Sequence, residues 1–168
     1  MKPLLEADPN TRRVALRTPA GLLAFGFGAG LSRFAPGTAG TLVAVPLALL
    51  LKQLPQPAYW AALVLLFAAG VWICARASRD LGQADPGGIV WDEMVGYWLT
   101  VALLPASLSL WVLAFLLFRL FDILKPWPIR QLERGIGGGL GIMLDDVVAA
   151  LYAMAVLEIG QRWVSQLV

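Results

Sequence analysis

Apolar residues gather in long runs along the chain, and short polar stretches separate these runs. The run over residues 59–77 holds 19 residues, about the length of a helix that crosses a bilayer. Shorter apolar runs cover residues 39–51, 89–104, 110–123 and 143–159. The pattern predicts an all-α, polytopic membrane bundle with about four to five spanning helices.

The N-terminal part of the chain does not follow this pattern. Residues 1–19 are polar, and we expect them to form a mobile cytosolic tail. Residues 21–30 are apolar but rich in glycine, and ten residues are too few to span a bilayer, which takes about 20. We therefore expect this segment to be re-entrant or to lie at the membrane interface.

Composition supports a membrane location. Hydrophobic residues make up 59% of the chain and charged residues 14%, whereas soluble domains carry about 25% charged residues. A soluble helical protein with an oversized core is the alternative. The single cysteine, Cys74, excludes a disulfide framework, and the absence of histidine excludes histidine bases, nucleophiles and metal ligands.

Lysine and arginine are distributed unevenly between the two predicted faces of the membrane. With a cytosolic N-terminus, eleven of them fall inside, and only Lys52 and Arg162 fall outside. This bias predicts a multi-pass protein in that orientation. The same topology places most of the acidic residues on the cytosolic face, namely Asp85, Asp92, Glu93, Asp122, Asp145 and Asp146.

Charged residues stand at the cytosolic ends of three apolar runs. Arg119, Asp122 and Lys125 are spaced three residues apart, so they share one face of a helix that Pro126 and Pro128 end. We expect two acidic pairs to occupy the first turns of two further helices, where the helix dipole favours carboxylates. These pairs are Asp92-Glu93 and Asp145-Asp146. We expect the three charged ends to meet at one place.

A fourth polar segment precedes the first apolar run. Pro36-Gly37 is a turn signal, and Thr38 is suited to cap the helix that follows. Backbone amides at such a helix start attract an anion, and Arg33 is close enough in sequence to assist. An ordinary turn with a helix cap is the simpler interpretation of the same residues.

Carboxylates crowded together at an apolar boundary repel one another and remain charged only beside a cation. Oxygen ligands suit Mg²⁺, and nearby arginine and lysine side chains suit phosphate. The predicted arrangement therefore indicates metal-assisted phosphoryl transfer. The sequence contains neither a Cys-x5-Arg nor an Asp-x-Asp motif, so the attacking group is water or one of the carboxylates.

Four segments of the chain resemble the phosphatidylglycerophosphatase A family. They are FAPGTAGT (34–41), DPGGIVWDEMVG (85–96), the stretch from Phe118 to Arg130, and GGLGIMLDD (138–146). The resemblance implies a bacterial inner-membrane lipid phosphatase that faces the cytosol. Such an enzyme cleaves phosphatidylglycerophosphate to phosphatidylglycerol and phosphate with Mg²⁺. Its membrane-embedded phosphatase domain is then residues 20–168.

The resemblance, together with the positions of the charged groups, implies roles for the following residues. We expect Asp92, Glu93, Asp122 and Asp146 to hold the metal. Asp145 completes the catalytic set, in which one carboxylate serves as the base. We expect the phospholipid phosphate to be gripped by Arg119 and Lys125, with help from Arg33, Thr38 and Arg130.

Three other functions fit part of the sequence. A small transporter also carries acids and glycine-broken segments in the membrane, although its acids lie near the midplane. A non-catalytic partner of lipid-synthesis enzymes would need no metal. A cytidine-nucleotide-dependent phosphatidyltransferase would carry an aspartate-rich signature that this sequence lacks. Nothing in the sequence indicates a nucleic-acid partner.

Overall fold

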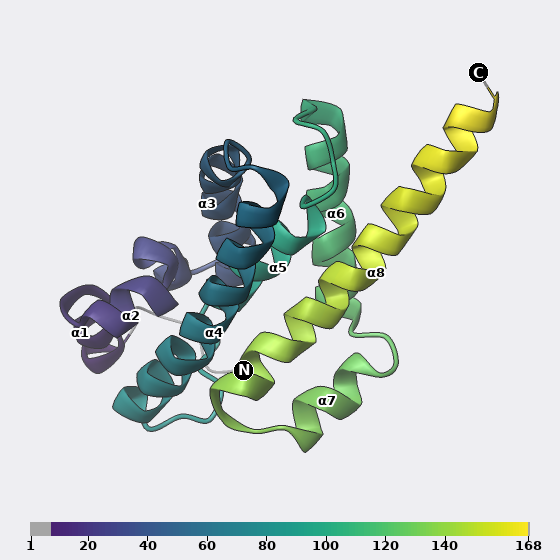
Figure 1. Cartoon of the computed structure of the whole chain (residues 1–168). Coiled ribbons are helices and arrows are strands. Elements are labelled where there is room, and N and C mark those ends of the chain that lie inside the picture. The colour runs from purple at the N-terminus through teal and green to yellow at the C-terminus, as the bar shows by residue number, and fades with distance from the viewer. Residues whose placement is uncertain (1–7, 168) are drawn as a thin grey trace.

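A computed structural model describes residues 8–167 of the chain as helices joined by short loops (Figure 1). This range contains no strand, so the predicted all-α class is confirmed. The elements in chain order are α1 (Pro9–Arg17), α2 (Pro19–Ala24), the 3-10 helix η1 (Gly26–Leu31), α3 (Pro36–Leu51), α4 (Gln56–Leu81), α5 (Trp91–Thr100), α6 (Leu108–Leu124), α7 (Ile129–Gly135) and α8 (Gly138–Leu167).

The short helix α5 forms the centre of the fold. It packs against α3, α4, α6 and α8, and none of its residues is exposed. Small residues allow this close packing. Gly96 of α5 contacts the ring of Phe118 on α6, and Gly70 of α4 contacts Trp91 and Met143.

Hydrogen bonds to backbone carbonyls fix α5 against its neighbours. Trp98 Nε1 donates to Ala44 O of α3 over 2.9 Å, and the Tyr59 hydroxyl of α4 donates to Trp98 O over 2.7 Å. The C-terminal end is held by Lys52, whose Nζ donates to the carbonyls of residues 102 and 104 at 2.7 and 2.8 Å. These bonds satisfy polar groups that are buried in an apolar setting.

Within residues 8–167, two helices are long and apolar enough to cross a membrane, namely α4 and residues 138–163 of α8. The predicted run 59–77 therefore lies inside a longer helix, α4. The predicted span over residues 89–104 is wrong in length, because α5 has only 10 residues and ends in a turn before Pro105. The runs 39–51 and 110–123 correspond to α3 and α6, with 16 and 17 residues.

The polar tail that we expected over residues 1–19 contains a helix in its described part. The Asp8 side chain caps α1 by accepting bonds from the amides of Asn10 and Thr11, and Pro9 begins the helix. Val14 and Ala15 are buried where α1 packs on α2. The expected segment 21–30 is divided between α2 and η1.

Helices occupy most of the glycine-rich stretch after α6. Residues 129–135 form α7, and α8 begins at Gly138, before the predicted run 143–159. Asp145 and Asp146 consequently lie beyond the first turn of α8, and the prediction that they occupy that turn is wrong. Residues 161–167 continue α8 beyond the predicted run 143–159.

Candidate active site

Three carboxylates from two helices converge at the start of α5. One oxygen each of Asp92, Glu93 and Asp146 lies within 4.8 Å of the others. The first two occupy the first turn of α5, as predicted, and the third comes from α8. Two oxygens bound to one Mg²⁺ lie at most about 4.2 Å apart, because each bond is about 2.1 Å long. The three side chains are therefore nearly close enough to share one ion.

Each of these carboxylates has a buried oxygen without a hydrogen-bond partner among the described residues. The atoms are Asp92 Oδ1, Glu93 Oε2 and Asp146 Oδ1. A buried charged oxygen without a partner is costly. Three carboxylates that cluster in this way and each keep an unsatisfied oxygen make a ligand set suited to a hard divalent cation.

Arg119 of α6 connects the acidic cluster to the end of that helix. Its Nη1 lies 2.6 Å from Asp122 Oδ2 and 3.7 Å from Glu93 Oε1, and only 13% of its side chain is exposed. Asp122 also lies within electrostatic range of Asp146. The guanidinium retains a buried Nε–H without a partner among the described residues. It thus provides positive charge and an unused donor beside the carboxylates.

Gly37, in the first turn of α3, closes the other side of the cluster. A Cβ atom at this position would collide with Glu93 Oε1 and crowd the terminal nitrogens of Arg119. The absence of a side chain therefore lets α3 begin directly against the acidic cluster. Sequence reasoning treated Gly37 only as part of a turn and missed this contact.

A second group of charges lies beside the first. Lys125 Nζ donates to Asp145 Oδ2 over 2.8 Å and lies 3.1 Å from Glu133 Oε1 of α7. Burial alone would lower the pKa of Lys125, but the hydrogen bonds and charges of Asp145 and Glu133 outweigh it and raise that pKa above its usual value. Glu133, which sequence analysis left out, thus belongs to this group.

The remaining predicted residues lie outside the two charged groups. Thr38 does not cap α3, because the N-cap is Ala35 in the left-handed conformation. Arg33 is exposed and makes no ion pair with any residue in the described range. Arg130 donates to the carbonyl of Leu124 over 3.2 Å, which ties α7 to the end of α6. Asp85 is exposed and shares a cavity of about 260 Å³ with Asp145 and Glu133.

The described residues form an all-helical fold with an acidic cluster beside a buried arginine. Residues 22–161 match the family model of phosphatidylglycerophosphatase A, and the chain belongs to this family. The phosphatidylglycerophosphatase A of Escherichia coli K12 is 44% identical over 158 residues, which cover 93% of this chain and 92% of that protein. The chain is therefore an enzyme, a phosphoric monoester hydrolase.

Two further relatives cover nearly as much of the chain. The phosphatidylglycerophosphatase A of Haemophilus influenzae is 44% identical over 90% of this chain and 94% of its own length. A protein of Bacteroides thetaiotaomicron named as a putative phosphatidylinositol-3-phosphatase is 43% identical over 85% of this chain and 93% of its own. No solved structure shows a significant match to the chain.

Proposed function

We propose that this enzyme hydrolyses phosphatidylglycerophosphate to phosphatidylglycerol and inorganic phosphate. The family match and the names of two relatives support this substrate. The observation that carries the proposal is the convergence of Asp92, Glu93 and Asp146 next to Arg119. This arrangement pairs a site for a cation with a side chain suited to the phosphate.

Mg²⁺ is the cation that we propose for the site. Asp92, Glu93 and Asp146 would hold it, and Asp122, which contacts Arg119, lies next to them. When bound, the ion neutralises phosphate oxygens and lowers the pKa of bound water. The buried oxygens without partners support this assignment, because they are the atoms that a cation would satisfy.

Arg119 is the residue that we propose for holding the phosphate. Its guanidinium already lies against Glu93 and Asp122, and its unused Nε–H is available as a donor. In the reaction a water oxygen attacks the phosphorus, and the bond to the glycerol oxygen breaks. A carboxylate of the cluster takes a proton from the water and then gives it to the glycerol oxygen, which leaves as a hydroxyl.

We also propose that the enzyme is a multi-pass protein of the bacterial inner membrane with its site toward the cytosol. The N-terminal ends of α3, α5 and α8 and the C-terminal end of α6 lie near the site, so one side of the bundle carries the charged groups (Figure 1). The exposure of α4 and α8 supports contact with lipid. In the apolar 18-residue stretch of each helix, only 28% of the residues of α4 and 44% of those of α8 are buried.

The direct test is phosphate release by the purified chain in detergent. The substrates compared are phosphatidylglycerophosphate, phosphatidic acid and a soluble phosphomonoester such as glycerol 3-phosphate. We expect the first to be cleaved with the highest kcat/KM. Equal rates on all three would contradict the proposed substrate, and no release from any of them would contradict phosphatase activity of the purified chain.

The Bacteroides relative gives a specific reason to test a second lipid. Its name describes an enzyme that removes a phosphate from inositol rather than from glycerol. Both lipids present a phosphate monoester at the membrane surface, so the same charged groups could act on either. Phosphatidylinositol 3-phosphate therefore belongs in the panel, and a higher kcat/KM for it would replace phosphatidylglycerophosphate as the substrate.

A further inference from the structure

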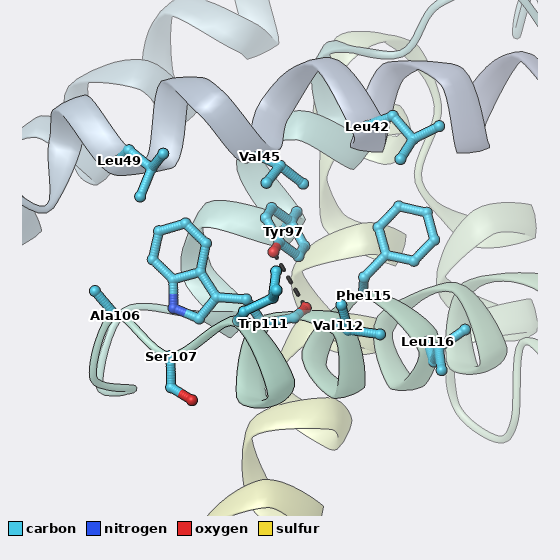
Figure 2. A pocket seen from close by; sticks show the side chains of 11 residues that line it. Leu42, Val45, Leu49, Tyr97, Ala106, Ser107, Trp111, Val112, Phe115 and Leu116 are labelled. Atoms are coloured by element: carbon cyan, nitrogen blue, oxygen red, sulfur yellow. Dashed lines mark hydrogen bonds between the residues drawn. The ribbon is translucent and has the colours of Figure 1, made fainter.

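An apolar groove lies between α3 and α6, and no charged residue lines it. Its volume is about 640 Å³, within the range of about 300–1,000 Å³ typical of ligand sites. Figure 2 shows the side chains of Leu42, Val45 and Leu49 on α3 facing those of Trp111 and Phe115 on α6. Val112 and Leu116 complete the α6 wall.

The groove exists because α3 and α6 do not pack closely together in the described part of the chain. Each packs on α5 instead, and Tyr97 of α5 forms the floor between them. The Tyr97 hydroxyl donates to the carbonyl of Trp111, so this polar atom is satisfied and offers little to a ligand (Figure 2). The lining therefore suits a hydrocarbon rather than a polar ligand.

Both walls of the groove lead to the charged site. Leu42 follows Gly37 by five residues on α3, and Leu116 precedes Arg119 by three on α6, so the near end lies about 5–8 Å from those residues along the helices. The side chains of Leu42 and Leu116 are 57% and 58% exposed, so this end is open.

The length of the groove matches one leaflet of a bilayer. From Arg119 back to Leu108, the first residue of α6 in the lining, α6 rises about 16 Å over eleven residues. Half of a hydrocarbon core of about 30 Å is about 15 Å. A lipid with its phosphate at Arg119 thus has room for an acyl chain along the whole groove.

We propose that this groove holds one acyl chain of the lipid substrate while its phosphate lies at Arg119 and the acidic cluster. This assignment rests on the proposed function, because it requires a substrate with both a phosphate and a hydrocarbon chain. Two features of the groove favour a lipid over other occupants. Positive charge stands at one end, and the lining beyond it is almost entirely apolar. The groove then selects lipid phosphates over soluble ones.

Two substitutions on α6 form a matched pair that tests the groove. Val112→Trp fills it, whereas Leu113→Trp places the same ring one residue away on a partly exposed position that does not line it. The measurement is the ratio of kcat/KM for oleoyl and hexanoyl forms of phosphatidylglycerophosphate. We expect Val112→Trp to lower this ratio by at least about tenfold, because methylene groups lose their apolar contacts. Leu113→Trp should leave it within about twofold of the parent.

Equal ratios in the two variants and the parent would overturn the groove as an acyl site. That result differs from failure of the proposed function, in which the parent itself releases no phosphate from either lipid. A fall of the ratio in both variants alike would also overturn the assignment, because the loss would then not depend on filling the groove.

Photo-crosslinking of the unmodified chain gives a second test that does not depend on variant folding. The probe is phosphatidylglycerophosphate with a diazirine in one acyl chain, in detergent micelles. We expect mass spectrometry to place the adducts mainly on residues 42–49 and 108–116. Adducts spread over the outer faces of α4 and α8, with none enriched in the groove, would overturn the proposal.

Discussion

The backbone of Gly37 lies directly against the carboxylate of Glu93, so that a Cβ atom at position 37 would collide with Glu93 Oε1. The two residues come from the first turns of α3 and α5, and Arg119 of α6 lies against both. This contact explains how three helices can converge on one small cluster. It also makes a glycine, which has no functional group, part of the geometry of the site.

Gly37→Ala is therefore expected to lower kcat/KM by at least about tenfold, since a displacement of about 1 Å in a catalytic group can cost a hundredfold. The effect should come from displacement of Glu93 rather than from helix propensity, which favours alanine. Gly160→Ala is the matched control, because Gly160 also lies in a helix and has no atom within 4 Å of the added Cβ. Activity within about twofold of the parent in both variants would contradict the importance of this contact.

The acidic cluster should be indispensable for phosphate release. Asp92→Asn, Glu93→Gln, Asp122→Asn and Asp146→Asn are each expected to lower kcat by at least about a hundredfold, the usual scale for lost acid–base catalysis. Asp80→Asn is the control, because among the described residues Asp80 pairs only with the exposed Arg76 one turn away. Near-normal activity in all four variants would remove the cluster from the mechanism.

Removal of divalent cations should stop turnover and also change the stability of the protein. We expect a chelator to abolish phosphate release, and added Mg²⁺ to raise the midpoint of thermal unfolding, because a bound ion stabilises the folded state. The rise should be absent in Asp92→Asn and Asp146→Asn, which lose ligands of the proposed site. Full activity in excess chelator, with no effect of Mg²⁺ on unfolding, would refute the metal assignment.

Lys125 should contribute to stability through its bonds to Asp145 and Glu133. Lys125→Met leaves the partly buried Asp145 carboxylate without its partner and is expected to destabilise the fold by about 1–3 kcal/mol, the scale of a hydrogen bond to a charged group. Arg76→Met breaks an exposed ion pair on α4 and should cost less than about 1 kcal/mol. Thermal unfolding in detergent compares the two variants.

The double variant Lys125→Met with Asp145→Asn tests whether the loss of stability comes from the interaction between Lys125 and Asp145. It should recover part of the lost stability, because the amide carries no charge that needs a partner. If the double variant were as unstable as the sum of both single losses, the two residues would not be coupled.

The proposed orientation predicts which loops an impermeant reagent can reach. In a Cys74→Ala background, Gln53→Cys lies between α3 and α4, and Gln83→Cys follows α4 at the end that carries the charged site. A membrane-impermeant maleimide added to spheroplasts should label the first and not the second, and both should react after lysis. Labelling of Gln83→Cys before lysis would contradict a cytosolic site.

The sequence predicted which parts of the chain converge, because two independent patterns agree. The apolar runs define helix directions, and the distribution of arginine and lysine places the charged ends on one face. Asp92, Glu93 and Asp146 accordingly share one cluster in the structure, and Arg119 lies beside it. The run at 59–77 holds 19 residues, so its length alone predicts a helix.

The lengths of the shorter helices could not be predicted in the same way. Gly138, Gly139 and Gly141 disfavour a helix in the sequence, because glycine costs about 1 kcal/mol in a helix. In the fold, Gly139 lies directly on the carbonyl of Val71 and the backbone of Ala75 in α4. This close approach, which needs a residue without a side chain, offsets the low propensity and is visible only in three dimensions.

The sequence also did not predict contacts between residues on different helices. The contact of Gly37 with Glu93 and the bond from Lys125 to Asp145 depend on how helices pack. The helix in the N-terminal tail did have a signal, since Asp8 followed by Pro9 is a helix start. The density of polar residues around it concealed that signal.

The enclosure of α5 has a consequence for the proposed membrane location. Both of its carboxylates lie on a helix with no exposed residue, and α4 and α8 are the longest helices around it. If these two helices cross the bilayer as proposed, a change in bilayer thickness would tilt them. The spacing of Asp92 and Glu93 is set within one turn of α5 and would stay unchanged, whereas the position of Asp146 would follow the tilt of α8.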